Sequence, residues 1–202
     1  QHGDRWTSII PLFHCAGCIL NLVGCLSHGA AYVGVPGFDP ENMFQVVERE
    51  RCTFLSGVPT SYLAMLDHPA RAQYDLSSLR AGSCGGADCN PHILRRCAEE
   101  FPMPGLSQVY GQTEGATLFV CPEADDPWRW ETAGLPLPGY ELRIVDPQTL
   151  TPLAAGETGE IQARGPMVMQ GYYKNPEATA ETITSGGWLR TGDLGYIRPD
   201  GR

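Results

Sequence analysis

Three short segments of the sequence carry residue types that could bind and activate a small molecule. Residues 83–87, Ser-Cys-Gly-Gly-Ala, are small enough for their backbone to lie against a flat ligand. Residues 110–115, Tyr-Gly-Gln-Thr-Glu-Gly, offer an aromatic face, a hydroxyl and a carboxylate at one tight turn. Residues 191–193, Thr-Gly-Asp, present an aspartate that is suited to hydrogen-bonding two vicinal hydroxyls.

Together, these groups predict a site for a nucleoside phosphate with Mg²⁺. The set comprises an aromatic platform, a hydroxyl donor, a carboxylate for a hard cation and an acceptor for a diol. Taken singly, a Tyr-Gly turn, a Gly-Gly pair or an aspartate in a turn is more often structural than functional. The prediction therefore depends on the combination of the three segments.

The elements that must position these segments alternate between strands and helices over the first 110 residues. Apolar runs predict the strands, and helix caps and apolar faces predict the helices, with Asp39 and Asn90 as N-caps and Pro59 and Pro91 at first positions. Such alternation is typical of a parallel sheet, and ligands bind beyond the carboxyl ends of its strands. The expected strands are 7–10, 31–35, 53–55, 79–83 and 107–110, and the expected helices are 15–27, 39–50, 59–66 and 90–101.

The pattern changes after an acidic, proline-bounded connector at residues 122–127. We therefore predict an α/β fold, with a parallel wound sheet and flanking helices over residues 1–121, followed by a small β-barrel-like unit over residues 122–202. Short strands are expected in this second unit at 141–145, 160–164, 188–190 and 196–198, with one short helix at 177–182.

Composition excludes several classes of protein. The 202 residues are 42% hydrophobic and 18% charged, which excludes a disordered chain, and the net charge of −9 argues against nucleic acid as a partner. No charged residue occurs from Trp6 to Phe38, but Pro11, His14 and Asn21 would be costly in a membrane. A buried strand, helix and strand explain this run better than a membrane span.

The eight cysteines do not form an obvious disulfide set. A chain of this length and apolar content does not need such cross-links, and several cysteines lie inside apolar runs, so packing is the interpretation that we favour. Cys15 and Cys18 form a CxxC without a second pair at zinc-finger spacing, which leaves a metal or redox role as the alternative. The only lysine, Lys174, is expected on the solvated surface of a polar turn.

Several ordered motifs also carry a resemblance. The motifs YGQTEG (110–115), SCGGA (83–87), TGDLGYIRPDGR (191–202) and GEIQARGPMVMQGYYKNPEAT (159–179) resemble the adenylate-forming acyl-CoA synthetase, or AMP-binding, family. PLFHCAG (11–17) and FLSGVPTSY (54–62) are similar to family segments at the acyl pocket, so the resemblance covers essentially the whole chain. It implies an acid–thiol ligase that joins a carboxylic acid to AMP from ATP, releases pyrophosphate and passes the acyl group to coenzyme A.

The resemblance implies a role for each matching residue. Tyr110, with Gly111 and Gln112, would bind the nucleotide by stacking at the adenine. Asp193 would accept hydrogen bonds from the ribose hydroxyls. The backbone of Gly85, Gly86 and Ala87 would border the base.

Three further residues would take part in the chemistry. Thr113 would donate to a phosphate, and Glu114 would hold Mg²⁺ as the metal ligand. His14 would gate the acyl pocket near the carboxylate, although a satisfied core histidine at a strand end is the competing interpretation.

The departures from the family pattern predict a fragment. The family's Gly/Ser/Thr-rich phosphate loop and its C-terminal domain, which carries the catalytic lysine, have no counterpart in these 202 residues. We therefore expect the 202-residue chain alone to be inactive. An oligomeric state is not predicted, and the expected location is cytoplasmic.

The expected substrate is a carboxylic acid without a free amino group. The resemblance implies that an amino-acid substrate would have its ammonium paired by an aspartate in residues 13–15; none occurs there, and burying an unpaired ammonium is costly. Residues 11–17 and 48–66 look most like medium-chain fatty acyl-CoA synthetases, and an aryl-CoA ligase or a non-catalytic nucleotide- or acyl-binding module are the alternatives. Small residues expected to leave room for an acyl tail are Gly17, Gly57, Ser83, Gly115 and Ala116.

Overall fold

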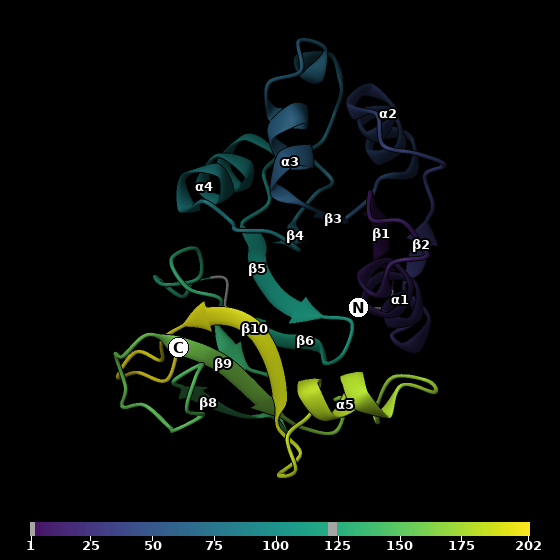
Figure 1. Cartoon of the computed structure of the whole chain (residues 1–202). Coiled ribbons are helices and arrows are strands. Elements are labelled where there is room, and N and C mark those ends of the chain that lie inside the picture. The colour runs from purple at the N-terminus through teal and green to yellow at the C-terminus, as the bar shows by residue number, and fades with distance from the viewer. Residues whose placement is uncertain (1–2, 121–124) are drawn as a thin grey trace. The chain divides into compact units, whose positions relative to one another are not determined.

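A computed structural model describes residues 3–120 and 125–202 of the chain (Figure 1). Two compact units can be distinguished. The first contains the residues up to Val109 together with 125–133, and the second contains Tyr110–Val120 together with Gly134–Arg202. The boundary that we predicted, between residues 121 and 122, falls outside the described residues. The structure assigns Tyr110–Val120 to the second unit, because strand β6 in this segment pairs with β7 of that unit.

Five parallel strands form the sheet of the first unit. Neighbouring strands pair in parallel throughout, and β3, for example, aligns Leu55 with Gly82 of β4. The α/β class and the parallel sheet are thereby confirmed. In spatial order the strands are β2 (Ala31–Val33), β1 (Arg5–Ser8), β3 (Phe54–Gly57), β4 (Ala81–Gly85) and β5 (Gly105–Gln112).

Helices cover both faces of this sheet. In Figure 1, α2, α3 and α4 lie on one side of the strands and α1 lies on the other. The predicted helix at 15–27 is helical throughout, but its first part is a π-helix. The helical elements are η1 (Ala16–Val23), α1 (Gly24–Ser27), α2 (Pro40–Glu50), α3 (Pro59–Leu66), the short 3₁₀ turn η2 (Arg71–Gln73) and α4 (Pro91–Glu100).

The predicted caps fix the helix starts. The Asp39 carboxylate accepts a hydrogen bond from the Asn42 backbone N–H at 2.9 Å, and the Asn90 side chain accepts one from the His92 N–H at 2.9 Å. A proline follows each cap at the first helical position, where its missing N–H removes no helical hydrogen bond. Both caps are confirmed.

The core of the first unit lies under α2, α3 and α4. Tyr62 is 1% exposed, and its hydroxyl donates to the carbonyl of Leu55 at 2.8 Å, so this polar group is satisfied in the interior. Cysteines fill part of the same core as small apolar side chains. The cysteines of this core are Cys52, Cys84, Cys89 and Cys97, and Cys25 is buried in α1.

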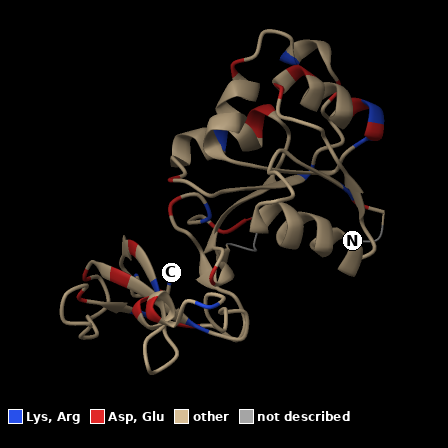
Figure 2. Cartoon of the chain, turned by 45° about the vertical axis from the view of Figure 1, so that its right-hand side comes forward, with Lys and Arg blue, Asp and Glu red and all other residues tan. Residues whose placement is uncertain are grey.

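The uncharged run from Trp6 to Phe38 forms β1, η1, α1 and β2. Figure 2 shows the helix of this run, beside the N label, without a charged residue. Within residues 3–120 and 125–202, no helix is long and apolar enough to cross a membrane.

The second unit is built on an antiparallel sheet of β10 (Leu189–Gly195), β9 (Gly159–Arg164) and β8 (Glu141–Val145), as expected of a β unit. The short helix α5 (Pro176–Thr182) is also confirmed. The predicted strand at 196–198 is wrong, because pairing between β10 and β9 ends at Gly195. Two strands were not expected, β6 (Ala116–Val120) and β7 (Leu135–Pro136), and they pair with each other.

Candidate functional site

Tyr110 and Asp193 meet in the second unit. The Tyr110 hydroxyl donates a hydrogen bond to Oδ2 of Asp193 at 2.5 Å. Burial of the half-buried ring and this bond to a carboxylate both raise the pKa of Tyr110 above its ordinary value. The ring also lies against Phe119, at 5.2 Å between centroids. An aromatic face and a carboxylate, which were predicted from separate motifs, therefore belong to one site.

A β-bulge points Asp193 out of its strand. The predicted strand at 188–190 is too short, because residues 191–193 also lie inside β10, where the register slips between Arg190 and Leu194. Gly192 has a φ of 74°, a conformation that a side chain would disfavour. Thr191 fixes the bulge, since its hydroxyl donates to the Ile161 carbonyl at 2.7 Å. Bulges commonly re-aim side chains in this way.

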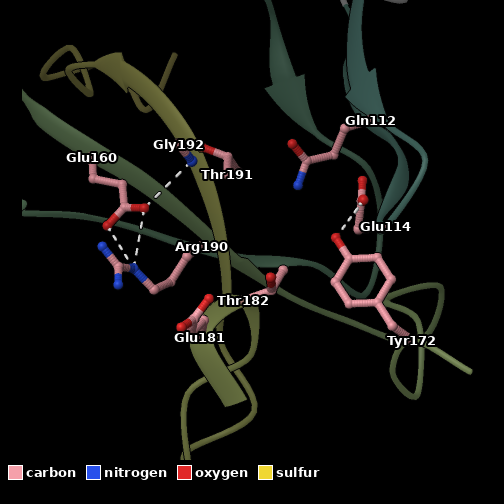
Figure 3. Close-up of a pocket in the computed structure, with 9 residues that line it drawn as sticks. All are labelled: Gln112, Glu114, Glu160, Tyr172, Glu181, Thr182, Arg190, Thr191 and Gly192. Carbon is pink, nitrogen blue, oxygen red and sulfur yellow. Dashed lines mark hydrogen bonds and ion pairs between the residues drawn. The ribbon is translucent and has the colours of Figure 1, made fainter. Parts of the chain in front are cut away.

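The buried carboxylate of Glu160, on the neighbouring strand β9, supports the bulge. Glu160 of β9 is 4% exposed, and it accepts from the Gly192 backbone N–H at 3.3 Å and from Nε of Arg190 at 3.2 Å. Figure 3 shows both interactions converging on the Glu160 side chain. The charge of Glu160 is thus compensated inside the sheet, which fixes the backbone one residue before Asp193.

Glu114 lies in the turn between β5 and β6. Oε1 of Glu114 accepts a hydrogen bond from the Tyr172 hydroxyl at 2.7 Å, as drawn in Figure 3. The carbonyl of Glu114 also accepts from the Met169 backbone N–H at 2.7 Å. Hydrogen bonding to the carboxylate raises the pKa of Tyr172. The segment around 169–172 therefore holds Glu114 by both its side chain and its backbone.

Glu114, Glu160 and Tyr172 are among the residues that line a pocket of about 350 Å³ within the second unit (Figure 3). Its lining is polar, with three carboxylates and one guanidinium, so it suits a hydrated, charged ligand rather than an apolar one. The lining residues are Gln112, Glu114, Glu160, Tyr172, Glu181, Thr182, Arg190, Thr191 and Gly192.

The donor set of this pocket fits Mg²⁺ bound together with a phosphate. Glu114 supplies one carboxylate, and Mg²⁺ commonly takes one or two carboxylates while phosphates and waters complete its shell. A site made of protein ligands alone is not seen, because the described ranges contain no group of three or more His, Cys, Asp or Glu side chains that could hold a metal.

The other predicted residues of the 110–115 segment adjoin this pocket. Gln112 lines it, whereas Gly111 precedes Gln112 at the exposed end of β5. Thr113 is exposed in the turn that follows. The strand is longer than expected, because β5 continues past Tyr110 to Gln112.

The segment 83–87 belongs to the first unit. Gly85 is still part of β4, and a Cβ there would lie 2.2 Å from the Val109 carbonyl oxygen, so close strand packing accounts for this glycine. Only Gly86 and Ala87 form the exposed turn. Their predicted position beside a base stays a prediction.

His14 is exposed in the turn before η1. Its Nδ1 accepts a hydrogen bond from the Ala16 backbone N–H at 3.1 Å. It is therefore not a core histidine, and its ring orientation is fixed by the helix start. A role beside an acyl carboxylate stays a prediction.

Three of the small residues expected to leave room for an acyl tail, Gly17, Gly57 and Ser83, lie close to neighbouring groups, and the acyl pocket stays a prediction. A Cβ on Gly17 would lie 2.1 Å from the Pro11 carbonyl oxygen, and one on Gly57 would lie 3.0 Å from Ile9. The hydroxyl of Ser83 is hydrogen-bonded to that of Ser56 at 2.8 Å. Lys174 is exposed in a turn, as expected.

Sequence reasoning missed the residues that hold the site together, namely Tyr172, Glu160 and Arg190. A signal was present for one of them. Glu160 and Gln162 alternate along β9, which puts two polar side chains on one face of a strand and indicates a buried polar network there. Tyr172 gave no comparable signal, because its partner Glu114 is 58 positions away.

Known proteins match the chain in both sequence and fold. A family model described as "AMP-binding enzyme" matches residues 1–173. The putative acyl-CoA synthetase YngI of Bacillus subtilis is 42% identical over 200 residues, which cover 98% of the chain and 36% of that relative. The chain therefore spans about a third of the length of this relative.

Two solved structures are similar over almost the whole chain. The anthranilate CoA ligase AuaEII in complex with anthranoyl-AMP superposes with a TM-score of 0.91 at 28% identity, over 100% of this chain and 39% of that one. ATP-bound MatB from Rhodopseudomonas palustris has a TM-score of 0.87 at 28% identity, over 98% of this chain and 39% of that one.

Proposed function

Because the chain belongs to the AMP-binding enzyme family, we propose that the protein containing it is an AMP-forming acyl-CoA ligase. It would join a carboxylic acid to the α-phosphate of ATP, with release of pyrophosphate. It would then transfer the acyl group from the adenylate to the thiol of coenzyme A, with release of AMP. The relatives named above include an acyl-CoA synthetase and a CoA ligase bound to an acyl-adenylate.

The observation that carries this proposal is the hydrogen bond between Tyr110 and Asp193. It brings an aromatic face and a carboxylate together from strands 83 positions apart. A carboxylate has about four lone-pair sites, so the bond to Tyr110 leaves acceptor capacity for ribose hydroxyls. We assign Tyr110 to the adenine and Asp193 to the ribose. Gly85, Gly86 and Ala87 are assigned to the border of the base, and Gly111 and Gln112 to the nucleotide segment.

Glu114 and Thr113 are assigned to the phosphates. A magnesium ion at Glu114 would neutralise phosphate charge and so stabilise the charge that develops during transfer. The chain's own contribution is to hold Glu114 in place: the Tyr172 hydroxyl donates to its carboxylate at 2.7 Å, and the Met169 N–H donates to its backbone carbonyl. Thr113, in the same turn, would donate its hydroxyl to a phosphate oxygen.

The substrate that we propose is a medium-chain fatty acid, with His14 beside its carboxylate. An aryl acid is the competing substrate, and the anthranilate ligase among the similar structures favours it. Coenzyme A is the proposed acyl acceptor, and the cytoplasm is the proposed location. A panel of straight-chain fatty acids and aryl acids, compared by kcat/KM, separates the two classes of substrate.

The test of the function uses the full-length protein. We expect carboxylate-dependent exchange of pyrophosphate into ATP, and we expect it to depend on Mg²⁺. Glu114→Gln should fold normally and lose most of this exchange, because an amide cannot balance cationic charge as a carboxylate does. Glu177→Gln in α5 is a matched control at an exposed position. Nucleotide binding without exchange would indicate a binding module instead of a ligase.

A further inference from the structure

Two buried thiols of the first unit lie next to each other. The Sγ atoms of Cys84 and Cys89 are 3.6 Å apart. Cys84, in strand β4, is 0% exposed, and Cys89, between β4 and α4, is 4% exposed. Neither thiol has a part in the proposed ligase reaction.

The two cysteines flank the turn that contains Gly86 and Ala87. Residues 86–88 and Asn90 are exposed, whereas Cys89 between them is buried against Cys84. The Cys89 thiol also contacts the Ala87 carbonyl oxygen at 3.4 Å. The position of this exposed turn is thus linked to the state of a buried sulfur atom.

We propose that Cys84 and Cys89 form an oxidation site, at which a peroxide converts the two thiols into one intramolecular disulfide. Cys89 attacks the peroxide, so that the O–O bond breaks, water or an alcohol leaves and a sulfenic acid forms on Cys89. The Cys84 thiol then attacks that sulfur, which forms the S–S bond, breaks the S–O bond and releases water. The two sulfur atoms lose two electrons in total, and the peroxide gains them.

The position of each thiol sets this order. Cys89 is reached first because it sits between exposed residues of a short connection, where a local opening uncovers it. Cys84 lies in a central strand, and both its hydrogen bond with Cys89 and its burial raise its pKa. A thiol of this kind is a poor first nucleophile, but it is well placed to attack an adjacent sulfenic acid.

The backbone can supply the movement that the disulfide needs. The sulfur atoms must approach from 3.6 Å to about 2 Å. Gly86, with a φ of 79°, lies between the two cysteines and has no side chain to restrict a change in its dihedral angles. The exposed turn can therefore move while β4 keeps its place in the sheet.

The disulfide would alter the segment that the proposed function assigns to the adenine. It would remove the Cys89 thiol hydrogen and with it the contact to the Ala87 carbonyl. It would also pull residues 86–88 toward β4. The resulting loss of nucleotide binding rests on the proposed function, whereas the formation of the disulfide does not.

A peptide map tests the oxidation itself. The 202-residue chain is treated with hydrogen peroxide, its remaining thiols are blocked, and it is cleaved with trypsin. The expected tryptic peptide Ala81–Arg95 contains Cys84 and Cys89 and no other cysteine. We expect this peptide to lose two hydrogen atoms and to regain them with dithiothreitol.

Three variants make this result specific. Cys84→Ser and Cys89→Ser should abolish the mass loss, while Cys97→Ser, at a buried thiol of α4, should retain it. A peptide that stays a dithiol, or that carries a sulfinic acid on Cys89 with Cys84 still reduced, overturns the proposal.

Pyrophosphate exchange by the full-length protein tests the consequence. Peroxide should lower exchange by the wild type and by Cys97→Ser several-fold, and dithiothreitol should restore it, while Cys89→Ser should keep its activity under the same treatment. If the reduced wild type shows no exchange, the proposed function fails and the peptide result still stands. If the disulfide forms and exchange is unchanged, the predicted effect on the turn is wrong.

Discussion

The Tyr110 hydroxyl donates a 2.5 Å hydrogen bond to the Asp193 carboxylate, and this bond joins β5 to the bulge of β10. Each residue alone has an ordinary structural explanation, since a tyrosine can pack on Phe119 and an aspartate can occupy a bulge. Their contact is harder to explain in that way, because it orients an aromatic ring and an exposed carboxylate together at one surface.

Replacing Asp193 should change the ionisation of Tyr110. Asp193→Asn keeps a hydrogen-bond acceptor but removes the negative charge that opposes phenolate formation. We expect the pKa of Tyr110 to fall but to stay above its ordinary value, because burial is the larger cause of the shift. Ultraviolet titration of the tyrosines, compared with the wild type, measures the change. Asp88→Asn, in an exposed turn, is the control, and identical titrations for all three chains would contradict the contact.

Tyr172→Phe should weaken the site at Glu114. The variant loses one hydroxyl, and hydrogen bonds to charged groups contribute about 1.5–3 kcal/mol when buried. Because Tyr172 is 38% exposed, we expect a smaller effect, roughly a fivefold rise in the Mg²⁺ concentration that half-saturates pyrophosphate exchange.

The neighbouring tyrosine provides the control for this variant. Tyr173 is 87% exposed, and Tyr173→Phe removes a hydroxyl of the same kind one position away. We expect it to leave the Mg²⁺ dependence unchanged. Equal shifts in both variants would show that Tyr172 does not act through Glu114.

Two Arg–Glu pairs in the antiparallel sheet should differ in their effect on stability. Glu160 is buried beside Arg190, so Glu160→Ala leaves a partly buried guanidinium and the Gly192 N–H without their acceptor. We expect a loss of about 2–4 kcal/mol in the free energy of unfolding. Glu141→Ala, which breaks an exposed pair with Arg164, should cost less than about 1 kcal/mol. Urea titrations measure both values, and similar losses would be evidence against a supporting role for Glu160.

The sequence predicted the elements well wherever a local signal defined them. Asp39 and Asn90 each precede a proline and an apolar helical face, so α2 and α4 begin where the caps predict. The prediction of a strand at 196–198 was wrong because no local signal decides whether a strand forms there. Strand pairing depends on a distant partner, and β9 has no residues left to pair beyond Gly159.

The candidate site was predictable in its chemistry but not in its geometry. Tyr110, Glu114 and Asp193 were identified by residue type and motif. The bulge that directs Asp193 depends on Gly192, Thr191 and the remote Glu160, and such a register shift leaves no local pattern. Tyr172 escaped detection because its role comes from a contact made only in the folded chain.

The buried thiols of the first unit should make it sensitive to alkaline pH. Burial raises the pKa of Cys52 to about 11, whereas an unfolded cysteine ionises near 9.0. Below pH 9 both states hold the proton, so this stabilising contribution is fully present. As the pH rises toward 11, the unfolded chain loses the proton and the folded chain keeps it. The free energy of unfolding should therefore fall by about 1.4 kcal/mol per pH unit for this thiol.

Cys52→Ala should make that fall shallower. Urea titrations between pH 9 and about 11, with a reductant present, measure the slope for each variant. Cys18→Ala, at a half-buried thiol, is the matched control. The free energy of unfolding should still fall with pH in every variant, because other buried groups contribute to it, among them Cys97 with a pKa of about 12. Parallel lines for the wild type and Cys52→Ala would show that the Cys52 thiol ionises as readily in the folded chain as in the unfolded one.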